Sequence, residues 1–254
     1  MSEAFERLHP AVQHHVVNSL GWTSLRPLQT LSIEPVLSGE HALLLAPTAQ
    51  GKTEAAFLPL LSRMLKEEWP GLSLLYVCPL RALLNNLHPR LERYAGFVGR
   101  RAGVWHGDVP DSVRRKLLSD PPDVLLTTPE SIEVMLTSRR VDRPWLFGRL
   151  RAVVIDELHA FAGDDRGWHL LSVLDRASRF AGRDLQRVGL SATIGNPDAL
   201  LDWLAGSSEG PRRVVSAPQA VAADADVKVD HVGSIENAAH VVSRLFPDEK
   251  RLVF

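Results

Sequence analysis

The stretch Ala46–Thr53, APTAQGKT, decides the fold, because it joins a buried apolar run, His41–Ala46, to a segment with helical spacing, Thr53–Lys66. Phosphate binding needs free backbone N–H groups at a helix N-terminus, a lysine for the β- and γ-phosphates and a hydroxyl for magnesium. The triplet Gly51–Thr53 supplies these positions, and we expect its lysine to lie on an open loop. A helix start with a capping threonine and a solvated lysine is the alternative, and the strand-to-helix context favours phosphate binding.

Short apolar runs alternate with amphipathic segments along the chain, which is typical of βα units on a parallel sheet. The runs are apolar on both sides, so helices should cover both faces of the sheet. The predicted strands are His41–Ala46, Ser73–Cys78, Ala102–Trp105, Asp123–Thr127, Arg151–Asp156 and Arg187–Leu190. The predicted helices are Ala11–Leu20, Pro27–Leu37, Thr53–Lys66, Leu80–Tyr94, Ser112–Leu118, Glu130–Leu136, Gly167–Phe180, Pro197–Leu204 and Ile235–Leu245. The fold class is therefore α/β, with three layers around a parallel sheet.

The composition indicates the kind of protein and limits the surfaces and disulfides that it can have. The 254 residues are 45% hydrophobic and 23% charged, which is typical of a soluble globular protein. A formal charge of −1 means that any surface for nucleic acid must be local. The single cysteine, Cys78, excludes an internal disulfide and favours a reducing, cytoplasmic compartment. No run of about 18 apolar residues occurs, so we expect neither secretion nor a membrane span.

The sequence predicts a main domain over residues 1–213, a linker over 214–232 and the start of a second domain over 233–254. The linker prediction rests on Ser216–Asp226, SAPQAVAADAD, which is small, polar and contains proline. The last residues, Leu252–Phe254, read as a buried strand whose partners would lie elsewhere. We therefore expect this sequence to be a truncated piece that stops as the second domain begins.

A second chemical signal is Asp156–His159, DELH, at the end of the predicted strand Arg151–Asp156. A carboxylate at the carboxyl edge of a parallel strand faces the crevice in which α/β sheets bind ligands. Asp156 would hold magnesium through water, and Glu157 would orient or deprotonate an attacking water. Alone, such an acidic pair is more often a helix N-cap, but its combination with Lys52 favours the catalytic interpretation.

Five motifs occur in the order and spacing of the first RecA-like domain of superfamily 2 helicases. They are APTAQGKT at 46–53, PLRAL at 79–83, TTPES at 127–131, DELH at 156–159 and SAT at 191–193. The longer match, DELHAFAGDDRGWHLL followed by GLSATIGNP, resembles the large helicase-related (Lhr-like) branch of the DEAD/DEAH-box helicases. The resemblance covers about Leu25 to Leu204 and implies a RecA-like P-loop NTPase domain, followed by a linker and the start of a second RecA-like domain.

The resemblance also implies a site for ATP and Mg²⁺. The catalytic residues would be Lys52, Asp156, Glu157 and His159, with His159 connecting the nucleotide site to nucleic acid. The ATP-binding residues would be Arg26, Gln29, Thr48, Ala49, Gln50, Gly51, Lys52 and Thr53, with Thr53 and Asp156 as magnesium ligands. Arg26 and Gln29 resemble the segment that reads adenine, although a helix that starts with proline gives the same residues for structural reasons. Ser191 and Thr193 would couple hydrolysis to domain movement.

One position departs from the family pattern, since Ala49 stands where the loop A-x-x-G-x-G-K-T has glycine. Glycine permits a left-handed backbone that costs another residue on the order of 1–2 kcal/mol. Either the loop is in an ordinary conformation here or the nucleotide affinity is reduced, and the sequence leaves both open.

Nucleic-acid contacts are expected from other motifs. The positions that resemble backbone-contacting residues of helicases are Pro79, Arg81, Gly107, Thr128, Pro129, Glu130 and Ser131. Between Arg81 and Lys116, eight basic residues outnumber three acidic ones, and in this setting we favour phosphate contact over a merely solvated face. Three tryptophans are expected to be packing anchors rather than base-stacking platforms, namely Trp105, Trp145 and Trp168.

The resemblance implies that the intact protein is an ATP-dependent helicase or translocase that moves 3′ to 5′ on DNA or RNA:DNA. An ATP-dependent clamp in a larger assembly, without unwinding, is the alternative, and a small-molecule phosphotransferase is disfavoured by the five motifs. Expected partners are single-stranded nucleic acid, with DNA favoured, a second RecA-like domain, and a larger repair or defence assembly, but no membrane. Because arginines of the second domain would stabilise the transferred phosphate, we expect residues 1–254 alone to be nearly inactive.

Overall fold

A computed structural model describes residues 2–217 and 233–245 of the chain. These residues form two compact units, Met1–Pro218 and Gln219–Phe254, and each is described by itself. Within the described ranges, no helix is both long and apolar enough to cross a membrane.

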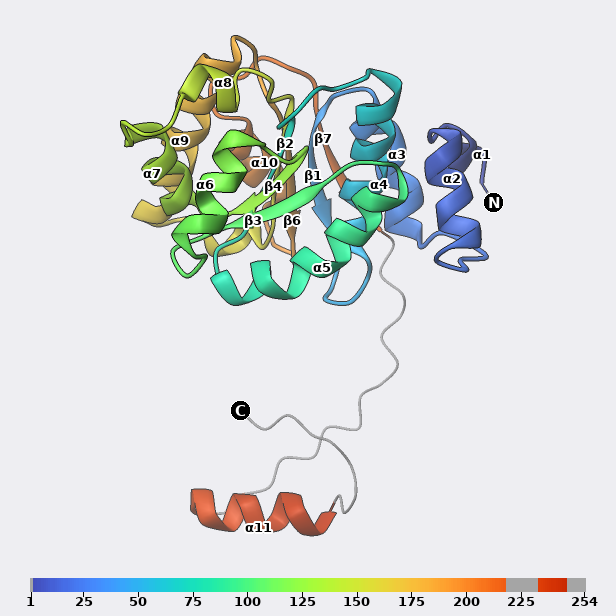
Figure 1. The fold of residues 1–254 in the computed structure, drawn as a ribbon. Coiled ribbons are helices and arrows are strands. Elements are labelled where there is room, and N and C mark those ends of the chain that lie inside the picture. Colours follow the sequence, from blue (N-terminus) through green and yellow to red (C-terminus); the bar gives the residue numbers. More distant parts are fainter. Residues whose placement is uncertain (1, 218–232, 246–254) are drawn as a thin grey trace. The chain divides into compact units, whose positions relative to one another are not determined.

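The first unit is built on a sheet of seven parallel strands in the order β3-β4-β2-β5-β6-β1-β7 (Figure 1). The strands are β1 His41–Leu45, β2 Leu74–Val77, β3 Ala102–Trp105, β4 Val124–Thr127, β5 Ala152–Ile155, β6 Gln186–Ser191 and β7 Arg212–Ser216. The six predicted strands are thus confirmed to within one residue at each end. The seventh, β7, pairs with β1 and extends the sheet beyond residue 213, where we expected a linker to begin.

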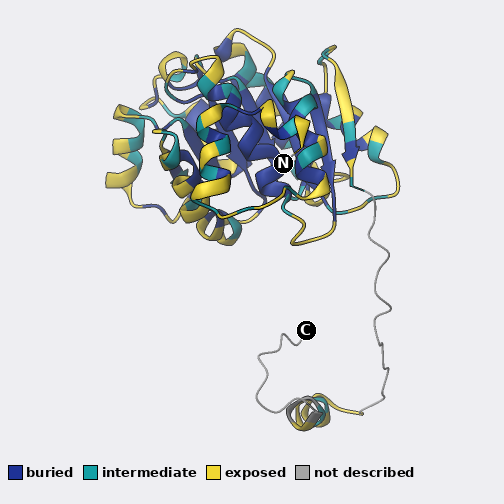
Figure 2. Ribbon diagram, turned by 90° about the vertical axis from the view of Figure 1, so that its right-hand side faces the viewer, coloured by how far each residue is buried: buried dark blue, intermediate teal, exposed yellow. Residues whose placement is uncertain are grey.

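Helices cover both faces of this sheet, so the three-layer α/β fold class is confirmed (Figure 1). One face carries α1 Glu3–Glu6, α2 Pro10–Asn18, α3 Pro27–Leu37, α4 Lys52–Lys66 and α5 Arg81–Phe97. The other carries α6 Asp111–Ser119, α7 Pro129–Thr137, α8 Arg143–Phe147, the 3₁₀ turn η1 Leu158–Ala160, α9 Asp165–Ala181 and α10 Pro197–Ala205. Alternate strand residues serve the two cores: Leu44 packs in the first and Leu43 in the second. The strands β1, β2, β4, β5 and β6 are accordingly buried along their whole length, whereas the edge strand β7 is largely exposed (Figure 2).

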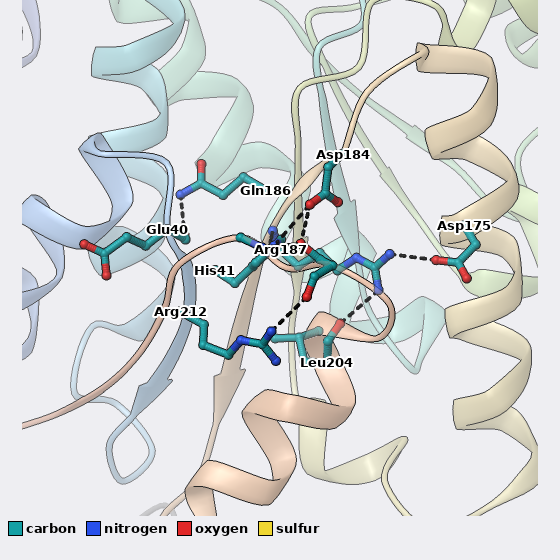
Figure 3. A network of polar contacts seen from close by, with 10 residues as sticks. Glu40, His41, Asp175, Asp184, Gln186, Arg187, Leu204 and Arg212 are labelled. Atoms are coloured by element: carbon teal, nitrogen blue, oxygen red, sulfur yellow. Dashed lines mark hydrogen bonds and ion pairs between the residues drawn. The ribbon is translucent and has the colours of Figure 1, made fainter.

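A network of polar contacts connects the amino ends of β1, β6 and β7 (Figure 3). The Arg187 side chain, only 2% exposed, donates to the Asp175 carboxylate at 2.7 Å and to the Leu204 carbonyl at 3.0 Å. The Arg187 backbone N–H donates to His41 Nδ1 at 3.0 Å, and His41 Nε2 lies 2.7 Å from the Ser208 hydroxyl. Burial lowers the pKa of His41, which favours the neutral ring that this hydrogen bond requires. The network therefore joins α9, α10 and three strands at the edge of the sheet remote from the carboxyl ends.

In the second unit the structure describes residues 233–245, and the predicted helix is confirmed as α11 Ile235–Leu245. Residues 218–232, most of the expected linker, lie outside the described residues. Residues 246–254, which include the predicted final strand, lie outside them as well.

Candidate functional site

A cavity of about 920 Å³ opens at the carboxyl ends of β1 and β5. Its volume is in the range of small-molecule and cofactor sites, about 300–1,000 Å³. Its lining includes Arg26, Gln29, Thr48, Ala49, Gln50, Gly51, Lys52, Thr53, Asp156 and Glu157. The structure thus brings together all eight residues expected to bind ATP and both expected acidic residues.

The loop after β1 wraps around its own lysine. Lys52 Nζ donates to the carbonyl of Ala46 at 2.8 Å and to that of Pro47 at 3.2 Å. The side chain is buried rather than lying on an open loop, which corrects our expectation. Helix α4 begins at this residue, so its free N–H groups and the positive end of its dipole lie beside the ammonium group. This arrangement suits a polyphosphate.

Two residues of the loop have left-handed backbones. Gly51 has φ 76°, and a Cβ there would lie 2.4 Å from Gln29 Nε2, so an alanine would strain the backbone and displace the end of the Gln29 side chain. Ala49 has φ 61°, so the loop has the strained conformation rather than an ordinary one. The strain costs on the order of 1–2 kcal/mol. A hydrogen bond from Arg26 Nη1 to the Ala49 carbonyl helps to hold this turn.

Helix α3 braces the loop from outside. Gln29 Oε1 accepts a hydrogen bond from the backbone N–H of Arg26 at 3.0 Å and so caps the helix. Gln29 Nε2 reaches the Gly51 carbonyl at 3.5 Å. These two side chains therefore have a clear structural role beside the cavity, and a role in reading adenine stays a prediction.

Asp156 follows β5 directly and is buried at the floor of the cavity. Its Oδ2 accepts a hydrogen bond from the Tyr76 hydroxyl at 2.9 Å, and its Oδ1 accepts one from the Glu157 N–H at 2.9 Å. Burial raises the pKa of Asp156 and the neighbouring Glu157 charge adds to this, while the Tyr76 hydrogen bond opposes it. The carboxylate is thus held by two donors but is costly to keep charged, which a nearby cation would offset.

Tyr76 connects the two expected magnesium ligands, since its buried hydroxyl interacts with the side chains of both Asp156 and Thr53. A hydroxyl and a carboxylate are the hard oxygen donors that Mg²⁺ prefers, so these residues fit the ion. Among the described residues, no three His, Cys, Asp or Glu side chains gather as a metal-binding cluster. Magnesium is commonly held by few protein ligands together with substrate phosphates.

The turn after Asp156 leads to the end of β6. Glu157 has a left-handed backbone, φ 48°, and is the N-cap of η1. His159 Nδ1 lies 3.2 Å from the Ser191 hydroxyl and 3.5 Å from Glu157 Oε2. The DELH and SAT segments are therefore in contact through these side chains, whereas Thr193 lies exposed beyond the strand.

The residues expected to contact nucleic acid follow the neighbouring strands β2, β3 and β4. Arg81 Nη1 pairs with Asp108 Oδ1 at 2.7 Å, and both side chains are more than half exposed. Gly107 lies against this arginine, where a Cβ would be 3.0 Å from Arg81 Nη2. At the start of α7, Thr128 Oγ1 accepts a hydrogen bond from the Ser131 N–H at 3.4 Å and caps the helix. We call the loops after β2, β3 and β4 the strand-binding half of the edge, after the single nucleic-acid strand expected to bind there. Those after β1, β5 and β6 are the nucleotide half, after the ATP expected there.

Pro79 and Glu130 complete the strand-binding half, and one arginine outside the predicted set joins them. Arg166 donates from Nε to Glu130 Oε1 at 2.7 Å and from Nη2 to the Pro79 carbonyl at 2.5 Å. Pro129 occupies the first turn of α7 beside Glu130. The sequence offered a signal for Arg166, since it lies within the long match that resembles the Lhr-like branch.

Two expectations about the surface need correction. Within the basic cluster, Arg100 and Arg101 lie before β3, at the opposite edge of the sheet, and they pair with Asp123 and Asp120. The cluster is therefore not one continuous surface. Of the three tryptophans, Trp105 is buried as expected, whereas Trp145 and Trp168 are 49% and 65% exposed and are not packing anchors.

Comparison with known proteins agrees with this geometry. The family model of the DEAD/DEAH box helicase matches residues 26–200. The Lhr helicase/probable uracil glycosylase of Mycolicibacterium smegmatis is 34% identical over 245 residues, which is 89% of this chain and 16% of that protein. The Lhr helicase/uracil glycosylase of Escherichia coli is 38% identical over 200 residues, 70% of this chain and 13% of that protein. A solved structure of Mycobacterium smegmatis helicase Lhr bound to ssDNA and AMP-PNP has a TM-score of 0.75 at 32% identity, covering 86% of this chain and 29% of that one. The chain thus spans less than a fifth of the length of these two curated relatives.

Proposed function

This chain belongs to the DEAD/DEAH box helicase family, and from that premise we propose that it is the ATP-binding motor domain of a nucleic-acid helicase or translocase. The observation that carries the proposal is the cavity in which Lys52 and Thr53 meet Asp156 and Glu157. The identity with Lhr helicases supports an Lhr-like enzyme. Movement in the 3′ to 5′ direction is the expectation that follows from the resemblance to that branch. Single-stranded DNA is the favoured substrate, because a structural relative is bound to ssDNA.

In this proposal each residue of the nucleotide half has a separate task. Lys52 exchanges the carbonyls of Ala46 and Pro47 for the β- and γ-phosphates of ATP. Thr53 and Asp156 supply the oxygen atoms for Mg²⁺, which when bound neutralises phosphate charge. Glu157 orients the attacking water and accepts its proton.

Coupling to the nucleic acid would start at the same turn. His159 contacts Ser191 at the end of β6 and Glu157 beside the reacting water, so it responds to changes at either position. Arg81, Gly107 and the start of α7 would bind the phosphate backbone of the single strand. Arginines of a second RecA-like domain would complete the transition-state charge stabilisation, and a repair or defence assembly would be the larger partner.

The proposal is tested by titrating the 254-residue chain with a fluorescent ATP analogue and Mg²⁺. Lys52→Ala should abolish binding, whereas Lys66→Ala, at the far end of the same helix, should leave it unchanged. Equal affinity in wild type and Lys52→Ala would contradict the phosphate-loop assignment.

A helicase motor and an ATP-dependent clamp are distinguished by ATP turnover. This turnover is measured on the chain joined to a second RecA-like domain. A motor hydrolyses ATP faster when single-stranded DNA is present. A clamp binds ATP and DNA tightly without turnover, and that result would refute the helicase proposal.

A further inference from the structure

Arg166 lies in the first turn of α9, outside the five motifs, and its guanidinium contacts three separate segments. It donates to the Pro79 carbonyl at 2.5 Å and to Glu130 Oε1 at 2.7 Å. Its guanidinium carbon lies 5.4 Å from the centre of the Phe161 ring, within the range of a cation–π contact. A planar fork with several fixed donors is suited to holding such groups at once.

The three contacts connect the two halves of the sheet edge. Pro79 follows β2 and leads into Arg81, while Glu130 lies in the first turn of α7. Phe161 is fully buried and is the C-cap of η1, two residues after the DELH segment of the nucleotide half. Although burial would raise the pKa of Glu130, the hydrogen bond from Arg166 lowers it, so the carboxylate is charged and able to pair. A shift of the DELH turn would therefore reach Pro79 and Glu130 through one side chain.

Helix packing alone does not require Arg166, because α9 and α7 have another ion pair. Arg176 Nη1 donates to Glu133 Oε1 at 3.1 Å, and His169 Nε2 lies 3.4 Å from the same carboxylate. This second pair lies further along both helices and touches neither Pro79 nor Phe161 in the contacts of the described residues. The chain thus offers a matched pair of arginines, of which only one reaches the motif loops.

We propose that Arg166 is a positioning residue that fixes the loops after β2 and β4 relative to the DELH turn, so that the state of the nucleotide site alters the grip on a single strand. The inference rests on the proposed function above. It assigns Arg166 an action through Pro79 and Glu130 rather than through direct contact with phosphate.

The test measures the affinity of the 254-residue chain for a labelled single-stranded DNA oligonucleotide by fluorescence anisotropy. Each variant is titrated without nucleotide and with a saturating non-hydrolysable ATP analogue and Mg²⁺. The dissociation constant for the oligonucleotide without nucleotide, divided by that with nucleotide, reports the coupling. A separate titration gives the nucleotide affinity. Circular dichroism and urea unfolding verify that each variant is folded at the assay temperature.

In wild type the ratio should differ from one. Arg166→Ala should weaken oligonucleotide binding about tenfold, as expected for the loss of a charged hydrogen bond, and should bring the ratio to one. The nucleotide affinity should stay within about twofold, because Arg166 does not line the cavity. Arg166→Lys should resemble Arg166→Ala, since lysine keeps the charge but lacks the fork. Glu130→Gln should also bring the ratio closer to one, and Arg176→Ala should behave as wild type.

Several results would overturn the inference. Wild-type affinity and ratio in Arg166→Ala would remove the positioning role, and a wild-type ratio of one would remove the coupling. Wild-type affinity and ratio in Arg166→Lys would mean that charge alone suffices, and an equal loss in Arg176→Ala would mean that general helix packing is responsible. If the wild-type chain bound no oligonucleotide, the proposed function itself would fail, which is distinct from the case in which wild type binds and the variants match it.

Discussion

Gly51 and Ala49 provide an internal comparison, because both have left-handed backbones in one loop but only one has room for a side chain. In Gly51→Ala, the backbone strain of about 1–2 kcal/mol is partly offset by about 0.5–1 kcal/mol from the stiffer unfolded chain. The new Cβ would also lie 2.4 Å from Gln29 Nε2 and displace the amide that caps α3, which costs about 1 kcal/mol more. The free energy of unfolding should therefore fall by about 2 kcal/mol. Ala49→Gly reverses the backbone effects at an exposed site and should gain about 0.5–1 kcal/mol.

Urea unfolding of both variants measures these changes, and titration with a fluorescent ATP analogue measures the consequence for binding. Gly51→Ala should weaken nucleotide binding at least about tenfold, because the N–H groups at the start of α4 shift. Ala49→Gly should keep the affinity or improve it. A loss of stability above about 1 kcal/mol in Ala49→Gly, or equal effects of the two substitutions, would refute the reasoning from backbone strain.

Three further predictions follow from the site and the network. Lys52→Ala should abolish nucleotide binding and also lower the free energy of unfolding by about 1 kcal/mol, because two loop carbonyls lose their donor; urea unfolding checks the second part. Arg81→Ala should weaken oligonucleotide binding equally for all sequences and reduce the salt slope by about one, with little change in stability because its pair with Asp108 is exposed. Burial lowers the pKa of His41 below 6.5, so the unfolded chain binds the proton more readily and the free energy of unfolding falls as the pH drops through and below 6.5. His41→Gln should reduce this pH dependence in urea titrations, and an unchanged slope would count against the neutral ring that accepts from the Arg187 N–H.

The parallel sheet was predictable because its strands are short, buried on both faces and separated by long amphipathic helices. The elements that escaped prediction lack such a signal. The helices α1 and α8 have four and five residues, too few to show a helical period. The edge strand β7 begins with two exposed arginines, so it reads as polar and was merged with the expected linker.

The cavity was predictable from its motifs, because a phosphate loop and an acidic strand end have recognisable residue types. The residues that support it were not. The Tyr76 hydroxyl is a single polar group within the apolar strand Leu74–Val77. Only the register of β2 beside β5 brings this hydroxyl to Asp156. Likewise, the exposure of Trp168 depends on which side of α9 faces the sheet, and its spacing from Leu170 and Leu171 alone did not determine that.

The strand order places the boundary between the strand-binding half and the nucleotide half at the ends of β2 and β5, because these two strands are neighbours. In the described part of the chain, two side-chain links are found there: Tyr76 to Asp156 inside the core, and Arg166 to Pro79 at the surface. The buried link is held by close packing and resists movement, whereas the Arg166 side chain is about one-third exposed and ends at a loop carbonyl. In the proposal for Arg166, the surface link would transmit a displacement, while the buried link would keep Asp156 in place.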